Sequence, residues 1–163
     1  MFILVGSRAA RRIDNRFRHP NDWDLMCLES EFEQWLNINM QSVKQVIRSP
    51  YGHKAKVHYG SGDRTVQIEF EFINRRPSCE ELVKLVHNSH LFEKLTDINE
   101  IGINNQSLVY SALMPVLYAT KRSHIYWPIH WKKNIVDLSY MMIRLKLVEI
   151  HPDLKRYFDL RYA

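Results

Sequence analysis

The chain is poor in the residues that build covalent or metal-linked frameworks. Only two cysteines, Cys27 and Cys79, occur among its 163 residues, so at most one disulfide can form and a disulfide framework is excluded. Neither cysteine nor histidine shows zinc-finger spacing, so no structural zinc site of that type is expected. This cysteine usage is typical of proteins that fold in a reducing compartment.

Long apolar runs are also missing. The first apolar run, Met1–Val5, ends at Gly6 and is too short for the hydrophobic region of a signal peptide. No later stretch approaches the roughly 20 apolar residues that a membrane-spanning helix needs. We therefore expect a cytoplasmic protein without a membrane partner.

Glycine and proline are scarce, with 5 and 6 residues respectively, which excludes a collagen-like chain. Hydrophobic residues make up 45% of the chain and charged residues 25%, as in ordinary globular domains. Lys and Arg number 23 against 18 Asp and Glu, which gives a net charge of +5. This modest excess is compatible with a polyanionic partner such as nucleic acid or a nucleotide phosphate.

The first ninety residues predict strands that alternate with helices. Apolar runs and polar–apolar alternation favour strands, and apolar spacing of three and four favours helices. Ser30 with Glu33, and Ser78 with Glu81, have the spacing of capping boxes at helix starts. The expected strands are 2–5, 22–27, 54–59 and 64–73, and the expected helices are 8–17, 30–47 and 78–87.

After Leu91 no strand pattern recurs, and the remaining segments predict helices. These are 108–121, with a kink at Pro115, then 131–145, and a last helix that begins at Pro152. We therefore predict an α+β protein. Residues 1–90 would form a mixed sheet flanked by helices, and residues 91–163 a helical accessory region packed on it.

Two motifs near the N-terminus suggest a site. Gly6 and Ser7 stand where the first strand meets a helix, and a glycine there lets the backbone approach a ligand closely. The amide N–H groups at the helix start suit a phosphate. On the second strand, Asp22 and Asp24 share one face because side chains alternate along a strand. Two such carboxylates repel each other unless a cation lies between them, and Mg²⁺ is usually held in this way.

A later strand offers a third carboxylate. Glu69 and Glu71 lie on one face of the expected strand 64–73, opposite its apolar face. One of them could complete a two-metal site, although both could equally belong to a solvated strand face.

In these motifs, residues 2–74 resemble the nucleotidyltransferase superfamily, which has the polymerase-beta-like fold. The segments Gly6-Ser7-Arg8-Ala9 and Asn21-Asp22-Trp23-Asp24-Leu25 are similar to its minimal and phage-encoded members. The resemblance implies a nucleotidyltransferase-like sheet and transfer of a nucleoside monophosphate from a nucleoside triphosphate, ATP included. The acceptor would be a hydroxyl or phosphate on an RNA end, a protein or a small molecule. Mg²⁺ or Mn²⁺ would be the cofactor.

The same resemblance implies roles for individual residues. Asp22, Asp24 and Glu69 would be catalytic, with Glu69 preferred over Glu71 because it lies nearer the middle of its strand. The implied metal ligands are Asp22, Asp24, Glu69 and Glu71, and the implied nucleotide-binding residues are Gly6, Ser7, Arg8 and Lys121.

Other residues have competing interpretations. Five arginines lie close together in the sequence, and they either contact RNA or a triphosphate or form a solvated helix face. They are Arg8, Arg11, Arg12, Arg16 and Arg18. Trp127 and Trp131 could stack a base, although core or interface positions are favoured. Asp137 is a candidate general base from the helical region. The main alternative function is a non-catalytic nucleic-acid-binding or regulatory module, of a phage accessory or toxin–antitoxin type, on the same fold. A purely structural protein is a third alternative.

Overall fold

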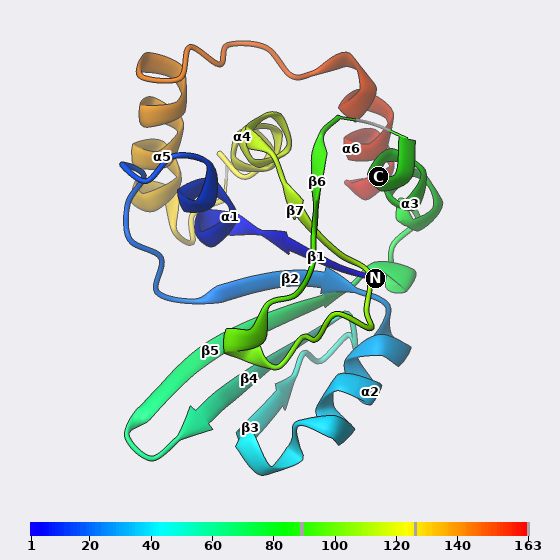
Figure 1. The fold of residues 1–163 in the computed structure, drawn as a ribbon. Coiled ribbons are helices and arrows are strands. Elements are labelled where there is room, and N and C mark those ends of the chain that lie inside the picture. The colour runs from blue at the N-terminus through cyan, green and yellow to red at the C-terminus, as the bar shows by residue number, and fades with distance from the viewer. Residues whose placement is uncertain (89, 126, 163) are drawn as a thin grey trace.

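A seven-stranded mixed sheet, in the order β3-β4-β5-β2-β1-β7-β6, runs through the computed structural model (Figure 1). The structure describes residues 1–88, 90–125 and 127–162. The strands are β1 (Phe2–Val5), β2 (Trp23–Cys27), β3 (Val43–Arg48), β4 (Lys54–Ser61), β5 (Arg64–Phe72), β6 (Phe92–Leu95) and β7 (Val109–Ala112). The α-helices are α1 (Gly6–Ile13), α2 (Glu29–Ile38), α3 (Cys79–Asn88), α4 (Met114–Ser123), α5 (Trp131–Ile143) and α6 (Lys155–Arg161). The expected α+β class with a mixed sheet is confirmed.

Helix α2 covers one face of the sheet. Its Phe32 and Trp35 rings contact Phe70 on β5, with centroids 4.9 and 4.8 Å away. The Trp35 indole N–H donates to the main-chain oxygen of Ile101 at 2.9 Å. Because side chains alternate along β5, this apolar packing leaves Glu69 and Glu71 on the opposite face.

Helices α1, α4, α5 and α6 lie on the other side of the sheet (Figure 1). The side chains of Ala9 and Ala10 are fully buried and small, which lets α1 approach the strands beneath it closely. Helix α4 contacts both α1 and α5, and it buries Leu117 and Tyr118. The helices leave part of the β2 and β5 surface uncovered, and the candidate site lies there.

Strand register brings the sequence motifs together. Strand β2 is parallel to β5, with Asp24 paired with Glu69 and Met26 with Glu71. Strand β1 is antiparallel to β2, and Val5 pairs with Asp24. The end of β1 and the start of α1 therefore lie beside Asp24.

The expected helix 30–47 is wrong at both ends. It begins at Glu29, and the capping residue is Glu31, whose carboxylate accepts from the Leu28 N–H at 3.4 Å, rather than Glu33. It ends at Ile38, and residues 43–48 form strand β3. The β-branched side chains of this segment fit a pleated sheet, and Val46 pairs with Val57 on β4.

The expectation that no strand follows Leu91 is also wrong. Strands β6 and β7 extend the same sheet, and β7 pairs in parallel with β1. Each has only four residues, too few to show a period in the sequence. Pro115 lies in the first turn of α4 and starts the helix instead of kinking it. Within the described residues, the wholly helical part of the expected region 91–163 therefore begins at Met114.

Candidate functional site

A cavity of about 580 Å³ opens on the face of the sheet opposite α2, and we call it the cleft. Strands β2 and β5 form its floor, and residues of α4 and α5 line its wall. The structure brings together in it every residue that the sequence nominated for the site, apart from Arg8. Those residues are Gly6, Ser7, Asp22, Asp24, Glu69, Glu71 and Lys121.

The start of α1 meets the floor of the cleft at Gly6. This residue has φ +71°, and a Cβ atom there would collide with the carboxylate of Asp24. A side chain is thus excluded both by backbone conformation and by space. Ser7 follows in the first turn of α1 and is buried. The free N–H groups of a helix start therefore lie next to Asp24.

Asp24 is in an unfavourable electrostatic position. Burial, then the neighbouring carboxylates of Glu69 and Asp22, raise the pKa of Asp24 to about 6, although Lys133 and Lys121 offset part of this effect. Burial and like charges both disfavour the ionised form. A cation bound between these carboxylates would reverse the effect, so the floor of the cleft suits a cation.

The two glutamates differ in their surroundings. Glu69 is partly exposed, accepts from Lys54 Nζ at 3.0 Å and lies 4.0 Å from Lys56 Nζ. Glu71 is buried between Arg161 and Arg76, at 2.8 and 3.1 Å. Burial opposes its ionisation, but these arginines outweigh burial and hold the pKa of Glu71 below its usual range.

Glu71 thus fits an ion pair that joins β5 to α6 better than it fits a metal ligand. The carboxylates that the sequence predicted as metal ligands also do not form a ready-made metal site. Among the described residues, no three Asp, Glu, His or Cys side chains are close enough together to hold a metal ion.

Lys121 is fixed in the wall of the cleft by buried partners. Its Nζ lies 2.9 Å from Asp137 Oδ2 and donates to Asn134 Oδ1 at 3.2 Å. Asp137 is 1% exposed and also accepts two hydrogen bonds from Arg18, at 2.7 and 3.0 Å. Burial disfavours its charge, but the bonds from Arg18 and Lys121 keep the pKa of Asp137 low. Asp137 does not line the cleft and holds Lys121 in place, so its expected role as a general base is not supported.

An aromatic pair forms the rim of the cleft. The His124 ring stacks on Trp127, with centroids 4.1 Å apart, and its Nε2 lies 2.9 Å from the Tyr162 hydroxyl. Burial, then Arg161, Lys121 and Lys54, lower the pKa of His124 to about 4, so the ring is neutral at pH 7. Trp127 and Trp131 are 49% and 50% exposed. Of the core or interface positions that the sequence favoured, the core positions are therefore excluded.

Four cations that line the cleft were not assigned to the site by sequence reasoning: Lys54, Lys56, Lys133 and Arg161. The alternation Lys54-Ala55-Lys56-Val57 was a usable signal, because it places both lysines on one strand face. Cross-strand pairing then sets Lys54 opposite Glu71 and Lys56 opposite Glu69. Lys133 and Arg161 come from helices far away in the sequence, and no local pattern identifies them.

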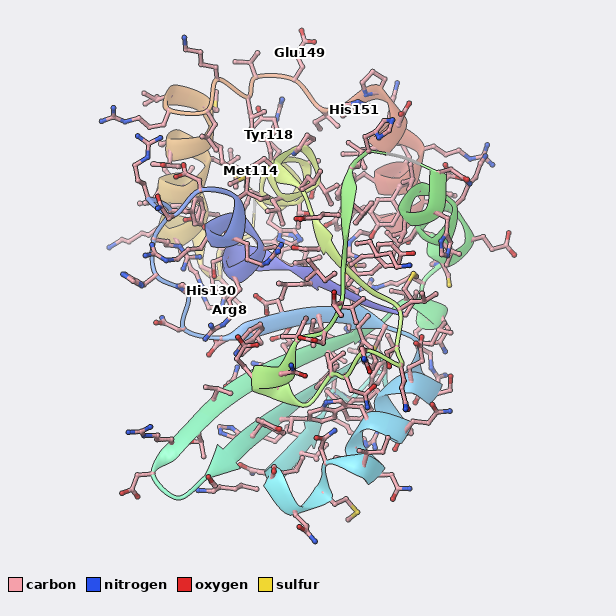
Figure 2. The ribbon with its side chains drawn as sticks, in the orientation of Figure 1. Arg8, Met114, Tyr118, His130, Glu149 and His151 are labelled. Atoms are coloured by element: carbon pink, nitrogen blue, oxygen red, sulfur yellow. The ribbon has the colours of Figure 1, made fainter. Side chains whose placement is uncertain are left out.

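The five arginines do not form one surface. Arg8, Arg11 and Arg12 line a different cavity. Arg8 is labelled in Figure 2. Its Nε donates to the main-chain oxygen of Asp22 at 3.1 Å, and its guanidinium lies 4.1 Å from the Trp23 ring centroid. Arg8 therefore does not line the cleft with the other predicted nucleotide-binding residues. Helix α1 ends at Ile13, so Arg16 and Arg18 lie beyond it.

Comparison with known proteins identifies a family but no activity. A family model described as "Domain of unknown function (DUF7277)" matches residues 2–134, which include the cleft-lining residues from β1 to the first turn of α5. No curated protein matches the chain. No helix within the described residues is long and apolar enough to cross a membrane.

Proposed function

Since the chain belongs to the DUF7277 family, whose name assigns no activity, we propose a function from the cleft: metal-dependent transfer of a nucleoside monophosphate. The donor is a nucleoside triphosphate, and the acceptor is a hydroxyl or phosphate group. One observation carries the proposal. The start of α1, with Gly6 and Ser7, lies directly against Asp24, and Asp22 and Glu69 line the same cavity. A helix start of the kind that suits a phosphate thus adjoins a group of carboxylates.

The carboxylates offer the donor atoms that Mg²⁺ or Mn²⁺ needs, and they would have to move closer together around a bound ion. Asp22, Asp24 and Glu69 supply the hard oxygen ligands that these ions prefer, and the raised pKa of Asp24 reflects negative charge that a cation would neutralise. Glu69 is the third ligand of choice because it is paired with Asp24 across β2 and β5, whereas Glu71 is held by two arginines. When bound, the ions would lower the pKa of the acceptor hydroxyl and stabilise the leaving oxygen.

The remaining residues orient the triphosphate. The N–H groups of the first turn of α1 and the Ser7 hydroxyl donate to phosphate oxygens. Lys121, held by Asp137, and Lys133 supply positive charge from the wall of the cleft. The acceptor oxygen bonds to the α-phosphorus, and the bond from that phosphorus to the β-phosphate oxygen breaks. Pyrophosphate leaves, and the hydroxyl proton passes to solvent.

The proposal is tested with α-labelled triphosphates, Mg²⁺ or Mn²⁺, and total RNA. The wild type is compared with Asp24→Asn and with Asp63→Asn, an exposed control in the β4–β5 turn. We expect label on RNA or on the protein, reduced at least about a hundredfold in Asp24→Asn, because this variant removes a metal ligand. Asp63→Asn should match the wild type. No transfer by the wild type with either metal, or equal transfer by Asp24→Asn, contradicts the proposal.

A second candidate is binding of nucleic acid without catalysis. It is favoured by the pairing of Glu69 with Lys54 and Lys56, which leaves this carboxylate partly neutralised. The same experiment separates the two candidates. Retention of labelled RNA on the protein, without transfer of any nucleotide, supports the second.

A further inference from the structure

A second cavity of about 750 Å³ lies beside α1, and we call it the α1 pocket. It is separate from the cleft, because the two cavities share no lining residue. Its walls come from α1, from the segment that leads into β2, and from the segment 94–100 that begins in β6.

The two cavities lie on opposite sides of one strand. Asp22 and Asp24 line the cleft, whereas Trp23 between them lines the α1 pocket. Helix α1 is divided in the same way, with Gly6 and Ser7 at the cleft and Arg8 at the pocket. Whatever binds in one cavity therefore contacts elements that also build the other.

The α1 pocket combines an apolar base with a positive rim. Its apolar residues are Leu4, Pro20, Trp23, Leu95 and Ile98. Its charged residues are Arg8, Arg11, Arg12 and Lys94 against Asp97 and Glu100, so the positive charges are in excess. An apolar surface with a cationic rim suits a ligand that is flat and apolar in one part and anionic in another.

Arg8 is the cation best placed to meet an anion. Within the described residues it forms no ion pair, and its only hydrogen bond runs from Nε to the Asp22 carbonyl. Burial lowers the pKa of Arg8, and the carboxylates of Asp22, Glu100 and Asp24 offset part of this effect. None of these carboxylates forms an ion pair with Arg8 within the described residues. Its guanidinium lies over the Trp23 ring, and this contact fixes the direction from which an anion can approach it. Arg12, in contrast, pairs with Glu93 at 3.2 Å.

We propose that the α1 pocket binds a nucleoside 5′-phosphate, with the base on the apolar surface at Trp23 and the phosphate on Arg8 and Lys94. The volume suits such a ligand, since small-molecule sites measure about 300–1,000 Å³. A guanidinium binds phosphate oxygens through two N–H groups at once, and the Nη groups of Arg8 remain available for this. Arg8 also donates a hydrogen bond to the main chain of Asp22. A ligand that binds Arg8 in this pocket therefore affects the position of the Asp22 carboxylate in the cleft. The proposal is independent of the activity proposed for the cleft.

Calorimetry on the full chain, with EDTA present, tests this proposal. The probes are the four nucleoside 5′-monophosphates, adenosine, inorganic phosphate and a 5′-phosphorylated RNA tetranucleotide. We expect at least one monophosphate to bind, with adenosine and phosphate at least about tenfold weaker, because each lacks half of the contacts. Tighter binding of the tetranucleotide than of its terminal monophosphate identifies a nucleic-acid end as the source. Equal or weaker binding identifies the free nucleotide.

Variants locate the binding. Arg8→Gln and Lys94→Gln should each weaken monophosphate binding about tenfold or more, the usual loss for one charged hydrogen bond to phosphate. Lys94 is exposed, so its variant remains informative if Arg8→Gln folds poorly. Arg16→Gln, at a residue 80% exposed on its side chain, should leave the affinity unchanged. Absence of monophosphate binding, or unchanged affinity in the folded Arg8 and Lys94 variants, overturns the proposal.

Discussion

At the scale of single residues, Gly6 and Asp24 depend on each other. Gly6 and Gly52 both have φ +71°, but only Gly6 has a neighbour where a Cβ atom would lie. Gly52→Ala should lower the unfolding free energy by about 1–2 kcal/mol, the cost of a left-handed conformation. Gly6→Ala should cost about 1–3 kcal/mol more, because its methyl group displaces the Asp24 carboxylate.

Urea unfolding of the two variants measures this difference directly. Gly52→Ala is the matched control, since its backbone conformation is the same and its surroundings are open. Equal losses in the two variants would show that the contact between Gly6 and Asp24 has no energetic weight.

Asp24 also makes stability depend on pH. Its pKa is about 6 in the folded protein, against about 4 for an unfolded aspartate, so the folded state binds this proton more tightly. The resulting stability is fully present below about pH 4 and is lost as the pH rises through about 6. Without divalent metal, the ionised carboxylate therefore destabilises the fold at pH 8, by about 2–3 kcal/mol at most.

Asp24→Asn should accordingly be more stable than the wild type at pH 8, and this advantage should disappear toward pH 4. Unfolding in EDTA at several pH values measures it. The difference between the two proteins isolates Asp24 from other titrating groups. A constant difference across this pH range would contradict the electrostatic description of the cleft floor.

At the scale of elements, one buried ion pair fastens α6 to the sheet. Arg161 and Glu71 are each about 10% exposed, at 11% and 10% of their side chains. Glu71→Gln leaves Arg161 with a buried, uncompensated charge, and we expect a loss of about 3 kcal/mol. Amide exchange should increase within α6. Arg156→Gln on the same helix should change stability by less than about 1 kcal/mol, because its pair with Glu81 is exposed on the arginine side.

This variant also decides between structural and ligand roles. If Glu71→Gln stays as stable as the wild type yet loses metal-dependent nucleotide binding, Glu71 is a metal ligand and our assignment is wrong.

The elements differ in how far the sequence predicts them. Helix α5 was predictable because its apolar residues recur with helical period over 13 residues. Strands β6 and β7 were not, since each is only four residues long and β7 is specified by its pairing with the distant strand β1. In β3 a β-branched run was mistaken for part of a helix, because Val43, Val46 and Ile47 also fit helical spacing. Tertiary pairing overrides local preference in all three strands.

The candidate site likewise contains some residues that the sequence predicts and others that it does not. Gly6, Ser7, Asp22 and Asp24 were predictable because strand period and a strand–helix junction fix their faces. Arg8, next to Ser7 in sequence, points to another cavity, since the direction of a helical side chain depends on the packing of the whole helix. The partners of Lys121 depend on how α4 packs on α5, and the sequence does not encode this locally.

At the scale of the whole molecule, the cleft joins segments from both ends of the chain. It is lined by Arg161 and by residues of α1, β2, β4, β5, α4 and α5. A ligand that bridges these segments stabilises the folded state by mass action, by about 2.7 kcal/mol at a hundred times its dissociation constant. Thermal unfolding should therefore shift upward when triphosphate and Mn²⁺ are added together. The shift should be larger than the sum of the separate shifts, and it should be absent in Asp24→Asn. Equal shifts in both proteins would place the ligand elsewhere.

The fate of each phosphate tests the central claim most directly. The protein is incubated with Mn²⁺, total RNA and a nucleoside triphosphate labelled on either the α- or the γ-phosphate. Nucleotidyl transfer predicts that the α-label moves to the acceptor and that the γ-label appears in pyrophosphate. Transfer of the γ-label to the acceptor, or release of both labels only as hydrolysis products, would contradict it.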